Sequence, residues 1–279
     1  MNEPLRVGRI SYTNDLPIYR AFDEGAVTLP GTLVAGVPAA LNAALLEGRL
    51  DLSPVSTYFY ALHADRFALL PHLCIGSRQD VWSVLLVSPH APEALDGARI
   101  AVTAESASGR ALLRILLERR YGVRAEFVEV VDPLAEALQG EPTLLIGDRA
   151  LDARRAVPPV DVYDLGALWH AWTGLDMVFA VWAVRRDVLE SRGHEVAAAL
   201  DALLAARAWG EANPERVVAA AEAQHPRDAG FYAAYYAALK FAFDGGAQAG
   251  LVRFFEEAVA IGALRCAPSA VPEGLHVAR

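Results

Sequence analysis

The chain has 279 residues, of which 54% are hydrophobic and 9% aromatic, and its formal net charge at pH 7 is −9. This composition supplies ample core material and excludes wholesale disorder, and the length allows one large domain or two of about 100–150 residues. The negative charge and the lack of any lysine- or arginine-rich run disfavour a nucleic-acid partner. A small anionic ligand remains compatible with this charge, because a few local donors can outweigh it.

The ends and the cysteines bear on location. The first ten residues, MNEPLRVGRI, lack the basic start and apolar stretch of a signal peptide. The longest apolar runs, such as MVFAVWAV, have about eight residues and are too short to span a bilayer. Cys74 and Cys266 have neither a CxxC partner nor a metal-ligand spacing. We therefore expect a reduced, cytoplasmic protein without a membrane partner, a disulfide or a zinc site.

Short runs rich in Val, Ile and Leu alternate with helical patterns along the first two thirds of the chain. The runs predict strands at 5–10, 31–37, 67–76, 81–88, 98–103, 125–131, 142–147 and 177–184. Helical patterns lie between many of them, at 38–50, 56–64, 108–122 and 133–140. This alternation predicts parallel α/β units, whereas the residues after about 187 are typical of helices only.

A proline-containing break at 88–97 interrupts the series, and a new strand–helix series begins at 98. A long strand then starts near residue 177 and leads into the helical tail. This order predicts two lobes joined by crossing segments near 85–92 and 176–186. We expect lobe 1 to comprise 1–87 and 182–279 and lobe 2 to comprise 88–181, with a ligand cleft between them.

Familiar catalytic signatures are missing from the sequence. It has no GxGxxG after the first strand and no GxxxxGK[ST], so dinucleotide and P-loop binding lack support. It has no GxSxG and no HExxH, and its seven histidines form no HxxH or HxxxH pair. The remaining candidates for site residues are small polar residues near the ends of strands.

Two predicted helix starts carry such residues. Ser56 and Thr57 follow a short strand, and Ser106, Ala107, Ser108 and Gly109 begin the first helix of lobe 2. Free N–H groups and the helix dipole make such starts sites for anions. Plain N-capping explains the same residues, because serine is a preferred cap.

Two further residues stand at junctions. Ser83 lies in the run VWSVLLVS, where period-two alternation places it on one strand face with Val81 and Leu85. A buried hydroxyl needs a partner, either backbone or ligand. Asn14, in the segment SYTNDLP, either shapes a turn or points at a ligand.

Several segments taken in order resemble one known family. They are VGRISYTNDLPIY, LEGRLDLSPVSTYFY, DVWSVLLVS, TAESASGRALLRILL, LIGDRAL and DLGALWHAWTGLDMVFAVW, within about residues 5 to 190. Together they resemble the chorismate dehydratase family of the futalosine route of menaquinone biosynthesis. The resemblance implies a two-lobed fold of the type II periplasmic-binding-protein kind, with an interlobe cleft and a helical C-terminal region, used as a cytoplasmic enzyme.

The resemblance also implies a reaction and a site. A carbon–oxygen lyase would remove water from chorismate, a dicarboxylate, to give 3-[(1-carboxyvinyl)oxy]benzoate without a cofactor or metal. Asn14 and Ser83 match active-site positions of the family. Because neither is a strong base, we expect the enolpyruvyl carboxylate of the substrate to take the proton. The residues expected to hold the carboxylates are Ser56, Thr57, Ser106, Ala107, Ser108 and Gly109, with Arg9 and Arg149 as further candidates.

Two alternatives remain open. The sister family, 1,4-dihydroxy-6-naphthoate synthase, depends on a histidine from its second lobe, and LLIGDRALDARR at 144–155 has none, which favours the dehydratase. A non-catalytic solute-binding protein for a small carboxylate would share the fold, which alone cannot separate binder from enzyme. The absent export signal argues against that binder. The sequence does not predict an oligomeric state.

Overall fold

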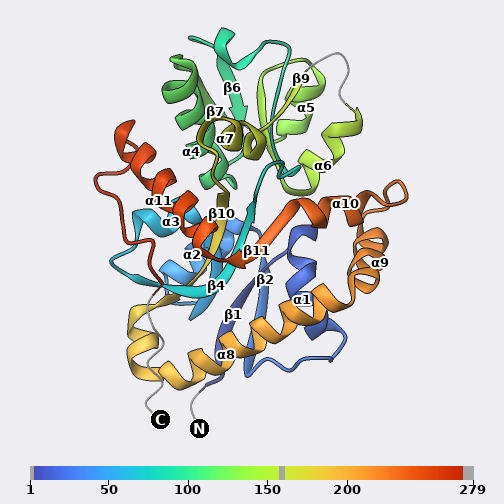
Figure 1. Cartoon of the computed structure of the whole chain (residues 1–279), viewed down its shortest axis with the longest axis vertical. Helices are drawn as coiled ribbons and strands as arrows, with labels where there is room; N and C mark the ends of the chain where they lie inside the picture. Colours follow the sequence, from blue (N-terminus) through green and yellow to red (C-terminus); the bar gives the residue numbers. More distant parts are fainter. Residues whose placement is uncertain (1–2, 157–160, 273–279) are drawn as a thin grey trace.

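The computed structural model describes residues 3–156 and 161–272. In these residues the strands form two sheets, one above the other in Figure 1, each flanked by helices. The larger sheet has the order β11 (Leu239–Phe243), β4 (Phe67–Ser77), β10 (Met177–Arg185), β3 (Leu52–Ser56), β1 (Leu5–Ile10) and β2 (Gly31–Gly36). The smaller sheet has the order β7 (Glu126–Glu129), β6 (Arg99–Val102), β8 (Thr143–Ile146), β5 (Val84–Ser88) and β9 (Asp161–Asp164). This arrangement confirms the predicted two-lobed α/β fold.

The helices of the first two thirds of the chain connect the strands. They are α1 (Leu16–Asp23), α2 (Pro38–Leu46), α3 (Thr57–Leu62), α4 (Ala107–Ile115), α5 (Pro133–Leu138), α6 (Gly147–Ala156) and α7 (Leu165–Thr173), with the short 3-10 helices η1 (Thr13–Asp15) and η2 (Pro92–Ala94) and the π-helix η3 (Leu116–Tyr121). The tail adds α8 (Arg186–Ala212), α9 (Pro214–Gln224), α10 (Phe231–Ala238) and α11 (Gly245–Ala260). The four predicted helical patterns correspond to α2, α3, α4 with η3, and α5.

Tertiary pairing explains the strands that the pattern missed. The tail is not helical throughout, because β11 adds to the edge of β4 in antiparallel fashion. Only its end residues, Leu239 and Phe243, are buried, so the segment LKFAF carries little strand signal of its own. The strand β9 has the sequence DVYD and forms only because β5 offers it an edge.

The chain passes between the sheets twice. It leaves the larger sheet after Ser77, and β5 already pairs with β8 and β9 of the smaller sheet. It returns with Met177, the first residue of β10, which pairs with β3 and β4. We therefore propose lobe boundaries in segments 78–83 and 174–176, somewhat before the limits 88 and 181 expected from the sequence.

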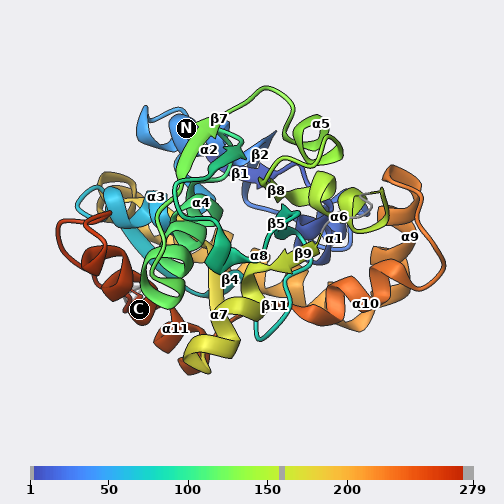
Figure 2. The same ribbon diagram turned by 90° about the horizontal axis from the view of Figure 1, so that it is seen from above.

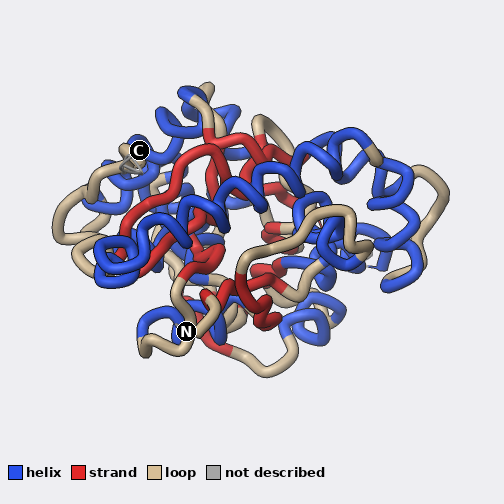
Figure 3. Tube along the Cα trace, turned by 90° about the horizontal axis from the view of Figure 1, so that it is seen from below, coloured by secondary structure: helices blue, strands red, loops and turns tan. Residues whose placement is uncertain are grey.

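Helix α8 fixes the position of α1, which directly follows the SYTNDLP segment. Figures 1 and 3 show α8 running across the larger sheet. At the crossing, a Cβ added to Gly210 of α8 would lie 1.9 Å from the carbonyl oxygen of Pro17. Only glycine allows this approach. No helix in the described part of the chain is long and apolar enough to cross a membrane.

The smaller sheet has helices on both faces. In Figure 2, α4 and α7 lie on one side of its strands, and α5 and α6 on the other. Along β5, Leu85 and Val87 pack with residues of α5 and α6, whereas Val84 and Leu86 join the main core. This alternation confirms the period-two expectation for residues 84–88.

Candidate active site

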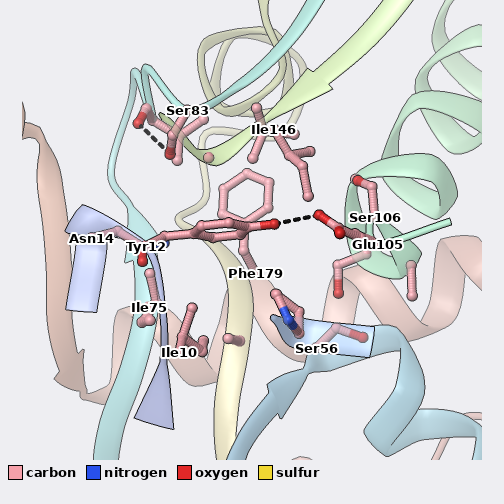
Figure 4. Close-up of a pocket in the computed structure, with 18 of the residues that line it drawn as sticks. Ile10, Tyr12, Asn14, Ser56, Ile75, Ser83, Glu105, Ser106, Ile146 and Phe179 are labelled. Atoms are coloured by element: carbon pink, nitrogen blue, oxygen red, sulfur yellow. Dashed lines mark hydrogen bonds between the residues drawn. The ribbon is translucent and has the colours of Figure 1, made fainter. Parts of the chain in front are cut away.

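A cavity of about 80 Å³ lies between the two sheets. Figure 4 shows polar side chains around it, brought together from both lobes. The larger lobe contributes Tyr12, Asn14 and Ser56 among apolar neighbours such as Ile10, Ile75 and Phe179. The smaller lobe and its connecting segment contribute Ser83, Val84, Glu105, Ser106, Ala107, Ser108, Gly109 and Ile146. Seven of the ten residues proposed from the sequence therefore line one space.

Asn14 lies in the short turn η1, between β1 and α1. The turn is held by other residues: both the hydroxyl and the N–H of Thr13 donate to Asp148, and the Tyr236 hydroxyl donates to the Thr13 carbonyl at 2.9 Å. The Asn14 side chain caps neither η1 nor α1. Its Oδ1 atom is buried and has no hydrogen-bond partner among the described residues. A ligand in the cavity would remove the cost of leaving this oxygen unsatisfied.

The next residue, Asp15, is fully buried, and this burial raises the pKa of its carboxyl well above the ordinary value, with Arg9 opposing the shift. The Arg9 Nε atom lies 3.6 Å from Asp15 Oδ2, and its two terminal nitrogens bind Asp23 at 2.5 and 2.8 Å. Arg9 does not line the cavity. The Arg9 guanidinium is thus engaged by two aspartates outside the cavity.

The start of α4 is open toward the cavity. Ser106 occupies the N-cap position but makes no side-chain cap hydrogen bond, and its buried Oγ has no partner among the described residues. The N–H groups of the first helical turn have no acceptor within the helix. Gly109 permits this arrangement, because a Cβ there would lie 2.4 Å from Ser106 Oγ. This helix start can accept an anion.

The start of α3, in contrast, is already capped. Ser56 Oγ accepts from the N–H of Phe59 at 3.2 Å, and Ser108 Oγ reaches from the other lobe to accept from the N–H of Tyr58 at 3.1 Å. Thr57 is fully buried and donates its hydroxyl to the Val178 carbonyl at 2.9 Å, so it does not line the cavity. At the start of α3 both serines therefore accept backbone N–H groups, and Thr57 lies outside the cavity.

Ser83 lies just before β5 rather than inside a strand. Trp82 has a φ of 65°, which breaks the extended conformation and makes the predicted alternation wrong for residues 81–83. The Ser83 hydroxyl donates to the Val81 carbonyl at 3.3 Å. Asp164 holds the same loop, since its Oδ2 accepts from the Trp82 N–H at 2.7 Å. Burial raises the pKa of Asp164, although backbone N–H groups oppose the shift.

Sequence reasoning missed two residues that face each other across the cavity. The Tyr12 hydroxyl donates to Glu105 Oε2 at 2.5 Å and so joins the two lobes (Figure 4). Burial and, next, this hydrogen bond raise the pKa of Tyr12. Both residues lie at the strand–helix junctions that hold Asn14 and Ser106, but they are not the small polar residues on which the prediction relied.

Arg149 belongs to a second hollow of about 370 Å³. Its guanidinium binds Asp132 at 2.9 Å, and both side chains are more than half exposed. The hollow shares Tyr12, Glu105 and Ile146 with the cavity but lies outside it. Arg149 is therefore not placed against a ligand in the cavity. No group of three or more potential metal ligands gathers in the residues that the structure describes.

Two sheets joined by two crossings, with a cavity between them, define the fold of the periplasmic binding proteins. The aliphatic sulphonate-binding protein SsuA of Escherichia coli shares it with a TM-score of 0.67 at 16% identity, covering 100% of this chain and 96% of that chain. The CA3427 gene product of Candida albicans shares it with a TM-score of 0.64 at 13% identity, covering 94% and 91% of the two chains. These similarities confirm the fold predicted from the sequence.

The chain belongs to the menaquinone biosynthesis family, whose model matches residues 5–260. Chorismate dehydratase of Thermus thermophilus is 40% identical over 201 residues, which cover 66% of this chain and 71% of that protein. The 1,4-dihydroxy-6-naphthoate synthase of the same organism is 30% identical over 278 residues, covering 97% and 98% of the two chains. The family inferred from the ordered segments is therefore confirmed.

Proposed function

We propose that this protein is a chorismate dehydratase, a carbon–oxygen lyase that converts chorismate to 3-[(1-carboxyvinyl)oxy]benzoate. The observation that carries the proposal is the pair of buried oxygens, Asn14 Oδ1 and Ser106 Oγ, that line one apolar cavity without partners among the described residues. A ring with carboxyl-bearing substituents can enter such a space, where a carboxylate accepts from the Ser106 hydroxyl and from the N–H₂ group of Asn14. The similarity to a chorismate dehydratase at 40% identity supports this reading.

The open start of α4 would hold one carboxylate. Its first-turn N–H groups and the Ser106 hydroxyl can donate to an anion, and the helix dipole favours negative charge there. Ser56 and Ser108 already accept backbone N–H groups, yet each hydroxyl keeps its own hydrogen to donate. A second carboxylate can therefore bind near these serines without breaking the caps.

The chemistry would need few protein groups. The proton leaves the ether-bearing ring carbon, the neighbouring C–O bond breaks, and the ring becomes aromatic. Asn14 is a neutral amide whose N–H₂ can stabilise developing negative charge, and the Ser83 hydroxyl donates to the Val81 carbonyl. Since neither is a base, we infer that the enolpyruvyl carboxylate takes the proton and delivers it to the departing hydroxyl, so that water leaves.

The sister synthase is the second candidate, because the family includes it and the similarity spans nearly the whole chain. It is disfavoured here by the cavity, whose described lining contains no histidine. We also propose a cytoplasmic location, which the similarity to a chorismate dehydratase supports.

A turnover assay with a binding control tests the proposal. The purified protein is incubated with chorismate in buffer without metal or nucleotide, and the enol ether is followed by chromatography. Ser106→Ala is the matched variant, and it should raise the KM more than it lowers kcat. Saturable binding of chorismate without turnover would instead indicate a solute-binding protein, and neither binding nor turnover would point to the synthase.

A further inference from the structure

The Tyr12–Glu105 contact lies inside the cavity that the proposed function assigns to the substrate. Tyr12 follows β1 in the larger lobe, and Glu105 precedes α4 in the smaller one. Figure 4 shows the Tyr12 ring extending across the space, with its hydroxyl at Glu105. The structure thus shows a six-membered ring whose hydroxyl donates a hydrogen bond to Glu105 Oε2 at 2.5 Å.

The Tyr12 ring occupies space that the proposed substrate would need, because it lines the cavity together with Asn14, Glu105 and Ser106. The adjoining hollow of about 370 Å³ also has Tyr12 in its lining, so the ring has space to move into.

Charge decides what can replace the Tyr12 hydroxyl. Tyr12 and Glu105 are the titratable side chains among the described residues of the cavity lining, and no ion pair joins Glu105 to a described Lys, Arg or His. A carboxylate only accepts hydrogen bonds. Chorismate has two carboxylates, an ether and one ring hydroxyl, so the hydroxyl is its only donor. The carboxylates, in contrast, have no hydrogen to donate to Glu105.

We propose that Glu105 determines specificity by accepting a hydrogen bond from the ring hydroxyl of the substrate. In the free protein the Tyr12 hydroxyl donates to Glu105 instead, until the substrate displaces it. The inference rests on the proposed function, because it takes chorismate as the ligand. This role of Glu105 also affects turnover. The product has lost the hydroxyl, so it leaves Glu105 unpaired, and the return of Tyr12 to Glu105 favours product release.

Two stable ligands that differ only in the hydroxyl test this inference. They are 3-[(1-carboxyvinyl)oxy]benzoate and its 4-hydroxy derivative, and their Kd values are measured by titration calorimetry. The proteins are the parent, Tyr12→Phe, Glu105→Ala and the control Glu129→Gln. Glu129 is an exposed carboxylate of the same lobe that pairs with Arg110. Circular dichroism and thermal melts verify that each variant folds.

The expected pattern follows from the shared acceptor. In the parent, the hydroxylated ligand replaces the Tyr12–Glu105 hydrogen bond with its own bond to Glu105, whereas the ligand without the hydroxyl only breaks the Tyr12–Glu105 bond. The parent should therefore prefer the hydroxylated ligand by about tenfold or more, the scale of a charge-assisted bond. Tyr12→Phe should tighten both ligands by a similar factor and leave the preference intact. Glu105→Ala should bring the preference close to one, and Glu129→Gln should change nothing.

Two results would overturn the inference. If Glu105→Ala still prefers the hydroxylated ligand, another group of the protein must bind the hydroxyl. Unchanged or weaker binding of both ligands to Tyr12→Phe would mean that Tyr12 does not compete for the acceptor. Either result leaves the proposed function standing if the parent still converts chorismate, whereas a parent that binds neither ligand and converts no chorismate refutes the proposed function itself.

Discussion

Gly109→Ala should damage the site far more than the fold. The new Cβ would lie 2.4 Å from Ser106 Oγ, 3.1 Å from Val84 Cγ1 and 3.6 Å from Ile146 Cγ2. The valine contact needs a shift of a few tenths of an ångström, and the serine can rotate about a single bond. Alanine in a helix is about 1 kcal/mol better than glycine, which offsets the about 1–3 kcal/mol typical of crowding. We expect the free energy of unfolding to change by no more than about 2 kcal/mol.

The effect on function is larger because the Ser106 hydroxyl must turn away from its place in the cavity. Losing one hydrogen bond to a charged ligand group costs about 1.5–3 kcal/mol, or about ten- to a hundredfold in KM. Urea unfolding and steady-state kinetics are compared for Gly109→Ala, Ser106→Ala and the double variant.

The double-variant cycle decides whether the clash is the cause. In a Ser106→Ala background the alanine at 109 has no hydroxyl to displace, so the double variant should be about as impaired as either single variant. If the two effects on KM multiply instead, Gly109→Ala does not act by displacing the Ser106 hydroxyl but through some other contact.

Three more predictions follow from the described contacts. Gly210→Ala should lower the free energy of unfolding by at least about 2 kcal/mol in urea titrations, because the Pro17 carbonyl cannot yield. Gly193→Ala in the same helix meets nothing within 4 Å and should cost nothing. Burial raises the pKa of Asp15, so ionising this carboxyl lowers the free energy of unfolding as the pH rises above the ordinary pKa of an aspartate. The increase in the free energy of unfolding caused by Asp15→Asn should therefore be larger at about pH 8 than at about pH 5, and an equal increase at both pH values would contradict this. Asn14→Asp should melt close to the parent yet lose at least about a hundredfold in turnover, whereas near-parent kinetics would remove Asn14 from the site.

Much of the fold was predictable because most of its strands are short runs rich in Val, Ile and Leu. The segment LRVGRI matches β1 residue for residue, and its signal needs no partner to be recognised. β9 and β11 differ, since DVYD and LKFAF become strands only by pairing with an existing edge. The pattern likewise placed the lobe limits late, because it could not show that β5 pairs in the smaller sheet.

Three residues proposed from element boundaries line the cavity: Ser106 and Ser108 start a helix, and Asn14 follows a strand. Arg9 and Arg149 lie outside it, and no sequence pattern could show that Arg9 pairs with Asp15 and Asp23 or that Arg149 pairs with Asp132. Tyr12 and Glu105 escaped notice because their hydrogen bond spans 93 positions of sequence and depends on how the lobes meet.

Conversion of chorismate by the purified protein is the most direct test of the proposed dehydratase activity. The parent protein is incubated with chorismate in metal-free buffer, beside a reaction without protein, and both are followed by liquid chromatography and mass spectrometry. We expect a catalytic, protein-dependent accumulation of one product that is lighter than chorismate by one water and has the retention time of 3-[(1-carboxyvinyl)oxy]benzoate. Recovery of unchanged chorismate at the rate of the protein-free reaction would contradict it.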